Sequence, residues 1–268
     1  MRQPGRAAIL ILAAAALSGC GEGKKQRVAE AVRADAVATG ETPATRFHLA
    51  NADAKVDLAL PPRIDNYPEL HKTLFEAGRQ DLLDFARTAA EDRKHATAKG
   101  APLRGPYERQ VAWTITSVSP HLIGLKAKWF ADTGGAHPNH GSEARLWDRL
   151  RNQFILPSEL FRDDYDVSAL DQVLCAATTQ AKARRMGPNP PGQWTCPKWS
   201  DSRFVLVPSV RPYRIGGLMF LFDPYVIGPY AEGDYEVLIP LSDFRRALSP
   251  AWAADFEDHP SPDVKPKP

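Results

Sequence analysis

Two histidines, His137 and His140, stand three positions apart beside Asp132 and the glycine pair Gly134 and Gly135. Imidazole and carboxylate groups are common zinc ligands, so these side chains could hold a metal ion. The alternative is that the two glycines supply a turn and that His137 closes the loop through hydrogen bonds. We favour the loop-closing role, and we predict neither a metal nor a cofactor.

The serine and carboxylate residues form no recognisable catalytic motif. Ser142 lies near His140, but it is not in the G-x-S-x-G context of a nucleophile elbow. Asp163, Asp164 and Asp166 could act as an acid–base pair, yet they precede an apolar pattern with helical spacing, where helix capping is the simpler role. The sequence therefore favours a protein that is not an enzyme.

The segment from Asp223 to Gly233 is the strongest candidate for a binding surface. It brings together Pro224, Tyr225, Pro229 and Tyr230. Aromatic side chains supply a large contact area, and tyrosine is enriched among the residues that dominate binding. The alternative is that both tyrosines pack beneath the loop, and Tyr230 is the one more expected to be buried.

A second loop, from Gly134 to Asn139, is expected to join this surface. Both loops should follow strands, and both are rich in glycine and proline, so their backbones can approach a ligand closely. We predict that Tyr225 is the anchor of a combined site. His137 and Asn139 would supply polar contacts, and Gly134 and Gly135 would shape the loop.

The first residues predict export from the cytoplasm. Arg2 and Arg6 precede an apolar run over residues 7–17, and the tetrapeptide Leu-Ser-Gly-Cys ends at Cys20. This order is typical of a secretion signal, and the tetrapeptide resembles a bacterial lipobox. We predict that residues 1–19 are a signal peptide and that an acylated Cys20 anchors the protein in the periplasm or at the outer membrane. The alternative is a buried N-terminal helix with a chance cysteine.

Composition divides the remaining chain. Residues 20–46 have few large apolar side chains and predict a tether, whereas residues 251–268 are proline-rich and, from Glu257 onward, are expected to be solvated and disordered. The leader contains two of the 34 basic residues and no acidic residue, so without it the basic residues equal the 32 acidic ones. A neutral protein has no global field to steer it onto nucleic acid or an anionic membrane, and we predict no nucleic-acid partner.

Cys175 and Cys196 form an even pair once Cys20 is set aside. Disulfides persist outside the cytosol, and closing a loop of this length stabilises a fold by roughly 3 kcal/mol. A metal site or a catalytic thiol would need histidine or cysteine neighbours at ligand spacing, which Cys175 lacks. We therefore predict a disulfide.

The elements that must position these residues follow from hydrophobic periodicity. Apolar residues with helical spacing predict one helix of about thirty residues that starts at Pro68 and a second that ends near Arg185. Alternating residues predict strands over 56–60, 107–115, 123–129, 204–206, 218–222 and 235–239. The fold class is therefore α+β, with two helices packed on a twisted antiparallel sheet.

Several motifs together resemble one known family. They are DTGGAHPN over residues 132–139, Leu160-Phe161, and a run from Gly217 to Pro240 that contains FDPY, IGPYAEG and VLIP. They are similar to the extracytoplasmic module of the lysozyme-sensing anti-sigma factor RsiV and of the non-catalytic N-terminal region of the peptidoglycan deacetylase PdaC. The resemblance implies a PdaC-type region over 47–142 and an RsiV-type region over 143–250, forming one compact body.

The resemblance also implies a function. It predicts a membrane-anchored, non-catalytic binding lipoprotein whose ligand is a lysozyme-type protein or a peptidoglycan fragment. Only a leader and a tether precede the module and only a proline-rich tail follows it, so we expect neither the sigma-binding domain nor the deacetylase domain. Asp132 stands where the family usually has an aromatic residue. A cell-wall hydrolase or deacetylase and a structural envelope protein without a specific ligand remain as alternatives.

Overall fold

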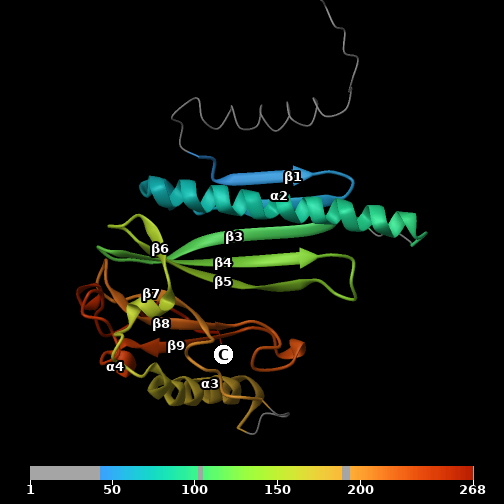
Figure 1. Cartoon of the computed structure of the whole chain (residues 1–268). Coiled ribbons are helices and arrows are strands. Elements are labelled where there is room, and N and C mark those ends of the chain that lie inside the picture. The colour runs from blue at the N-terminus through green and yellow to red at the C-terminus, as the bar shows by residue number, and fades with distance from the viewer. Residues whose placement is uncertain (1–42, 102–104, 189–193, 268) are drawn as a thin grey trace, which may run out of the picture. The chain divides into compact units, whose positions relative to one another are not determined.

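A six-stranded mixed sheet forms the first half of the body, with its strands in the order β1 to β6 (Figure 1). The computed structural model describes residues 43–101, 105–188 and 194–267, so the leader, Cys20 and nearly all of the tether lie outside the described residues. The strands are β1 (Arg46–Ala50), β2 (Ala54–Ala59), β3 (Tyr107–Val118), β4 (Leu122–Asp132), β5 (Asn139–Asp148) and β6 (Gln153–Ile155).

The long helix α2 (Pro68–Ala98) covers one face of this sheet. Pro68 occupies its first turn, where a missing N–H costs nothing, and the leucines that recur along it pack against β2, β3 and β4. A side chain at Gly78 would lie 3.0 Å from the side chain of Leu58, so the glycine lets the helix approach β2 closely. No described helix is long and apolar enough to cross a membrane.

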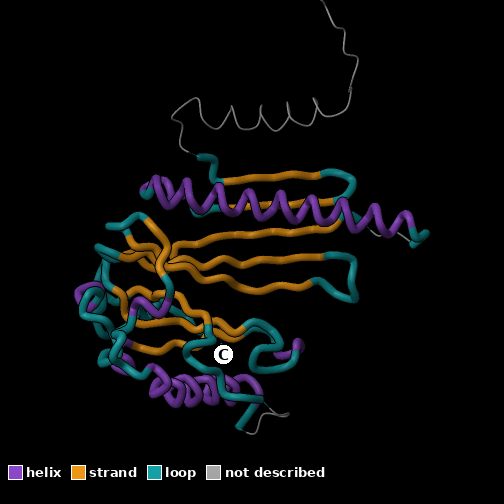
Figure 2. Tube along the Cα trace, viewed as in Figure 1, coloured by secondary structure: helices purple, strands orange, loops and turns teal. Residues whose placement is uncertain are grey.

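The second half contains a three-stranded antiparallel sheet and the helix α3 (Asp171–Met186). The strands are β7 (Arg203–Pro208), β8 (Ile215–Phe222) and β9 (Tyr235–Pro240), and a one-turn helix, α4 (Leu241–Phe244), follows β9. Every residue of β8 is buried because it is the central strand and both of its faces are covered. In Figure 2 the two long helices lie on opposite sides of the body, with most strands between them.

The two sheets contact each other through β7, which meets β3, β4 and β5. Gly124 permits a close approach, because a Cβ there would lie 2.9 Å from the Cβ of Leu206. Lys126 of β4 and Glu236 of β9 add an ion pair between the sheets. The described residues therefore form one continuous unit.

The α+β class is confirmed, but the single antiparallel sheet is wrong. There are two sheets, and β2 pairs with β3 in parallel. A parallel pair needs a crossover connection, and α2 provides it. Two strands of the prediction, over 107–115 and 123–129, form the expected antiparallel hairpin of β3 and β4.

Two local predictions are also wrong. Asp163 and Asp164 cap no helix: Asp164 pairs with Arg162, and the cap belongs to Asp166, which accepts a 2.9 Å hydrogen bond from the Ser168 amide in the short helix before α3. The predicted disordered tail is ordered as far as residue 267.

The tail is held by backbone pairing, by the apolar residues that precede Glu257 and by Val264, which packs on a small apolar cluster of β7 and β8. Trp252 and Phe256 are buried in the core that also contains β8 and β9, and Pro260 bridges to Ser209 beside β7. The Lys267 carbonyl accepts a 2.7 Å hydrogen bond from the Glu236 amide. These contacts tie the chain end to the three-stranded sheet, which composition alone did not indicate.

The predicted disulfide between Cys175 and Cys196 is present, with 5.0 Å between the two Cα atoms. It joins the N-terminal half of α3 to the segment that leads into β7. The Trp199 amide, three residues further on, donates a 2.7 Å hydrogen bond to Asp171 at the start of α3. The segment is therefore fixed along the helix at two points.

Candidate binding surface

The two predicted loops meet through the ring of Tyr230. Its centroid lies 4.7 Å from that of His137, 5.6 Å from that of His140 and 5.6 Å from that of Tyr225. The Tyr230 hydroxyl donates a 3.4 Å hydrogen bond to the Pro138 carbonyl. We call residues 134–140 and 223–233 together the aromatic-loop surface.

Asp223 fixes the base of this surface. One carboxylate oxygen accepts a 2.8 Å hydrogen bond from the Ser142 amide in β5, and the other lies 3.0 Å from the Arg203 guanidinium at the start of β7. A Cβ at Gly141 would lie 2.7 Å from the second oxygen, so the glycine makes room for it. Burial raises the pKa of the Asp223 carboxyl, and the charge of Arg203 only partly offsets this effect.

A buried ion pair supports the 223–233 loop from beneath. Lys182 of α3 is 1 % exposed, and its Nζ donates to Oε2 of Glu232 over 2.6 Å and to the Ile227 carbonyl over 2.8 Å. The Tyr235 hydroxyl donates to the same carboxylate oxygen over 2.6 Å. Three groups from α3, the loop and β9 are thereby held in one network.

The charges of this network shift two pKa values. Burial acts to raise the pKa of Glu232, but the hydrogen bonds from Lys182 and Tyr235 outweigh it, and the pKa is lowered. Burial and the neighbouring Glu232 carboxylate raise the pKa of Tyr235 to about 12. The ionised glutamate and the neutral phenol are therefore the stable forms near neutral pH.

Arg185, one turn after Lys182 on α3, extends the support to the end of the loop. Its guanidinium donates to the Glu232 carbonyl and, over 2.9 Å, to the Asp234 carbonyl. It also lies over the Tyr235 ring, 3.7 Å from the centroid. The C-terminal half of α3 thus holds the loop backbone in place.

The upper side of the loop is exposed. Tyr225 is 65 % exposed and has a φ of 73°, a left-handed backbone conformation that is unusual for a bulky residue. Val226 beside it is 52 % exposed. A groove of about 730 Å³ separates the loop from the end of α3, and Tyr225 and Pro229 line it. Tyr225 is the more exposed tyrosine and Tyr230 the more buried one.

The remaining predicted residues take structural positions in the first loop. Gly134 has a φ of 77°, and its amide donates a 2.8 Å hydrogen bond to Asp132, which turns the chain between β4 and β5. Asn139 is the first residue of β5 and opposes Ala131. Nδ1 of His137 lies 2.9 Å from the Pro138 carbonyl, a contact within the loop that fits the loop-closing role.

The remaining predicted residues of the second loop surround Tyr225. Pro224 directly precedes Tyr225, and Gly135 follows Gly134 in the turn between β4 and β5. Within the described residues, no group of three His, Cys, Asp or Glu side chains could hold a metal ion.

Lys182 and Glu232 were not expected at the site. They lie 50 positions apart, and charged residues are usually exposed, so neither type nor spacing indicated a buried pair. The one available signal is that Lys182 follows Ala181 within the apolar stripe of the second predicted helix.

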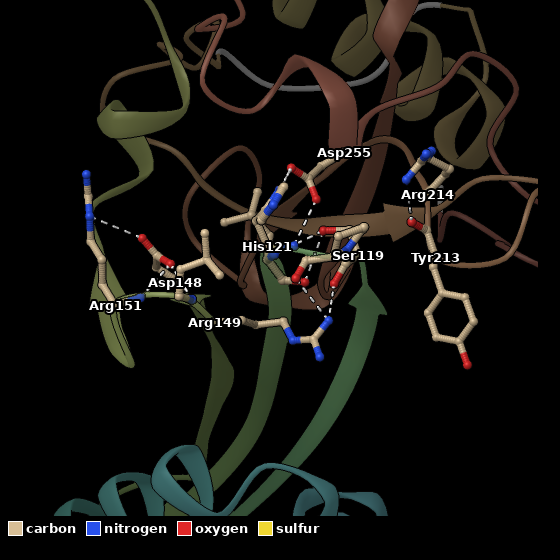
Figure 3. A network of polar contacts seen from close by, with 11 residues as sticks. Ser119, His121, Asp148, Arg149, Arg151, Tyr213, Arg214 and Asp255 are labelled. Carbon is tan, nitrogen blue, oxygen red and sulfur yellow. Dashed lines mark hydrogen bonds and ion pairs between the residues drawn. The ribbon is translucent and has the colours of Figure 1, made fainter.

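A second polar network lies at the other end of the strands (Figure 3). His121 donates from its backbone amide and from Nδ1 to the two oxygens of the fully buried Asp255 carboxylate, over 3.0 Å and 2.8 Å. Ser119 is also buried, and its hydroxyl bonds to the amide and the carbonyl of Leu122. The serine therefore shapes the β3–β4 turn, and the histidine joins that turn to the C-terminal segment.

Comparison with known proteins finds one family model that matches part of this body. Residues 158–242, which include α3, the 223–233 loop and all of the three-stranded sheet, match the family model described as "Protein of unknown function (DUF3298)". No curated protein matches the chain.

Two solved structures are similar to this body. One is a DUF3298 family protein from Pseudomonas aeruginosa PAO1, with a TM-score of 0.52 and 16 % identity, covering 82 % of this chain and 96 % of that one. The other is a member of the same family from Bacteroides fragilis, with a TM-score of 0.46 and 16 % identity, covering 78 % and 95 %. The Pseudomonas structure supports the fold and nothing finer. The family model thus matches residues 158–242 of this chain.

Proposed function

We propose that this chain is a non-catalytic binding protein of the bacterial cell envelope and that its ligand docks on the aromatic-loop surface. The observation that carries the proposal is the packing of Tyr230 against His137, His140 and Tyr225, which joins loops from two sheets beneath an exposed tyrosine. A surface that is already ordered loses little entropy on binding, and a rigid aromatic side chain makes an efficient anchor.

The buried network adds to the rigidity of this surface. Lys182, Glu232 and Tyr235 hold the underside of the 223–233 loop, so Tyr225 does not need to be ordered by the ligand. The polar side chains of the site are likewise engaged with one another. The Asp223 carboxylate accepts hydrogen bonds from the Ser142 amide and the Arg203 guanidinium, an arrangement that does not suit an acid or a base. This arrangement favours binding over hydrolysis or deacetylation.

The proposed ligand is a lysozyme-type protein or a peptidoglycan fragment, and this part rests on the resemblance to the RsiV and PdaC modules. The location rests on the lipobox-like sequence before Cys20. An acylated Cys20 would hold the protein on the periplasmic side of a membrane, and a tether of residues 20–46 would span roughly 80 Å when extended. The ligand-binding body could then reach the cell wall.

The test is titration of the purified protein with lysozyme and, separately, with muropeptides. Tyr225→Ala should weaken binding by at least about 2 kcal/mol, or roughly thirtyfold, because an exposed anchor loses its whole contact area. His137→Ala should weaken it less, since it removes one wall of the Tyr230 packing.

Tyr213→Ala is the matched control. Tyr213 is 69 % exposed and also has a positive φ, but it lies in the β7–β8 loop at the other end of the strands. Circular dichroism would show that each variant is folded. Wild-type protein that binds neither ligand, or a folded Tyr225→Ala variant with unchanged affinity, would contradict the proposal and leave the structural envelope role ahead.

A further inference from the structure

Four segments meet at the end of the body opposite the aromatic-loop surface. They are residues 119–121, 149–152, 209–214 and 255–259, which we call the Leu150 end. Its opposite position follows from the strands: β5 runs from Asn139 to Asp148, and β8 runs from Ile215 to Phe222, so each strand connects the two ends. Figure 3 shows the contacts of Arg149 with Ser119 and of His121 with Asp255, and the contact of Arg214 with Tyr213 within the 209–214 segment.

Hydrogen bonds make the Leu150 end continuous. The Arg149 amide donates to the His121 carbonyl over 2.8 Å, and the Arg149 guanidinium donates to the Ser119 carbonyl over 2.6 Å. His121 in turn binds Asp255. The Val210 amide donates to the His259 carbonyl over 3.1 Å, which brings the β7–β8 loop to the same segment.

Three apolar side chains project from this end. Leu150 is 73 % exposed, Tyr213 is 69 % exposed and Val210 is 54 % exposed. Leu150 is held outward because its own amide and that of Arg151 both donate to the buried Asp148 carboxylate, over 2.8 Å and 3.0 Å. None of the three side chains belongs to the hydrophobic clusters of the described residues.

In the ion pairs around these side chains, the arginine is more exposed than its carboxylate partner. Arg151 is 60 % exposed while the Asp148 carboxylate that faces it is 3 % exposed. Arg211 is 75 % exposed while its partner Glu257 is 26 % exposed. Arg214 donates to the Tyr213 carbonyl and pairs with no carboxylate among the described residues. The exposed charge is therefore mainly that of guanidinium groups, although Glu159, 41 % exposed, lies 3.8 Å from Arg151, and Asp258, 42 % exposed, pairs with Arg245.

The chain also enters the described body here. Nε2 of His71 donates to the carbonyl of Ala44 over 3.3 Å, and the backbone of His71 bonds to Tyr67. The guanidinium of Arg149 lies over the Tyr67 ring, 5.5 Å from its centroid. The first described residues are thus adjacent to the Leu150 end, and forty-two further residues precede them.

We infer that the Leu150 end docks on an anionic phospholipid surface, with Leu150, Val210 and Tyr213 entering the headgroup region and the arginines facing lipid phosphates. Tyrosine favours the membrane interface, and each basic side chain near an anionic surface strengthens binding. The formal net charge of the whole sequence is only +2, so it gives little long-range steering and the attraction comes from this local set of groups. The inference goes beyond the proposed function and needs no acyl anchor.

Such docking would fix the orientation of the binding site. Because β5 and β8 connect the two ends, a body resting on its Leu150 end would hold the aromatic-loop surface away from the lipid. The ligand would then meet Tyr225 on the side that faces the cell wall.

Vesicle flotation of residues 42–268 tests the inference, since this compact unit contains all the described cores and neither the acyl site nor the apolar leader. The protein should float with vesicles of phosphatidylcholine mixed equally with phosphatidylglycerol and not with phosphatidylcholine alone. High salt should release it, because screening removes the contribution of the arginines.

Variants separate the contributions. Leu150→Ser and Tyr213→Ser should each lower vesicle affinity about tenfold, by removing apolar area from the interface, and Arg214→Gln about fivefold. Tyr225→Ser is the matched control, because it removes a similarly exposed tyrosine from the other end. Its vesicle binding should equal that of the wild type, while Tyr213→Ser should keep wild-type binding of lysozyme or muropeptides.

Wild-type protein that fails to float with the anionic vesicles would overturn the inference. So would folded Leu150→Ser and Tyr213→Ser variants that bind as the wild type does, or equal binding to vesicles without phosphatidylglycerol. None of these results would affect the ligand titrations at Tyr225, so failure of the inference and failure of the proposed function are distinguishable.

Discussion

Replacing Lys182 by methionine should destabilise the body because it leaves the buried Glu232 carboxylate without its cation. The Lys182 and Glu232 side chains are 1 % and 3 % exposed, so water cannot substitute for the missing partner. Breaking a buried ion pair in this way costs about 3–5 kcal/mol. Tyr235 would still donate to Glu232, which places the expected loss near the lower end of that range.

The loss should depend on pH with a defined sign. In the wild type the folded-state pKa of Glu232 is lowered, so the stabilisation is present above the unfolded-state pKa and disappears as pH falls through the folded-state value. In Lys182→Met, Glu232 loses one of the hydrogen bonds that lower its pKa, whereas burial still acts to raise that pKa. Protonation of Glu232 in acid then removes the unpaired buried charge. The difference in the free energy of unfolding between the two proteins should therefore be largest near neutral pH and shrink in acid.

Urea unfolding at a series of pH values measures this difference, followed by circular dichroism. The double variant Lys182→Met with Glu232→Gln is the control, because it removes both charges and should cost much less than the sum of the two single variants. Additive losses, or a Lys182→Met loss that is the same at acid and neutral pH, would refute the buried-pair reasoning.

The alkaline limb gives an independent check on the same network. Because the pKa of Tyr235 is raised to about 12, the native state keeps its phenol proton where the unfolded chain has lost it. Stability should be fully present below pH 10 and fall by up to about 3 kcal/mol as pH rises towards 12. Tyr235→Phe should lack this fall, and a wild type with no fall would contradict the assignment.

Three further outcomes are expected. Cys20→Ala should abolish palmitate labelling and release the protein from membranes, and a variant that still labels would show that no lipid anchor forms at this residue. Thiol titration of the unreduced exported protein should find Cys175 and Cys196 unreactive, with reduction lowering the free energy of unfolding by about 3 kcal/mol; two free thiols would contradict the disulfide. Asp255→Asn should cost about 2 kcal/mol in urea unfolding by weakening the charged hydrogen bonds from His121, and unchanged stability would count against that pair as a structural fastening.

Local periodicity was sufficient for the long helix, for the β3–β4 hairpin and for the three strands of the second sheet. It failed for β5, whose residues on the α2 face include Gly141, Glu143 and Arg145, so the strand shows no apolar alternation. That strand forms because β4 pairs with it along its whole length. Strand formation depends strongly on such neighbours, and they cannot be read from the segment itself.

The candidate binding surface was likewise only partly predictable from the sequence. The aromatic and glycine-rich loops could be recognised from residue types within a few positions of one another. The partners that fix them could not, because Lys182 and Glu232 meet only after α3 packs on β9. Asp223 likewise reaches Ser142, 81 positions away, only when the two sheets come together. Contacts between residues so far apart in the sequence depend on tertiary packing. Lysine, glutamate and aspartate are usually exposed, so the residue types predicted exposed side chains here.

The stability of the fold does not explain why exposed tyrosines, Tyr213 and Tyr225, lie at the two ends of the body. Each is a bulky residue in the left-handed backbone region, with φ values of 57° and 73°, and each ring is mostly exposed. Glycine adopts this conformation without the steric penalty, which is about 1–2 kcal/mol for other residues, so the aromatic side chains make the folded state less stable than glycine would. Strain of this kind is characteristic of functional sites. An exposed ring that costs backbone energy is best explained by contacts with something outside the protein, and the two tyrosines lie at opposite ends of the same strands.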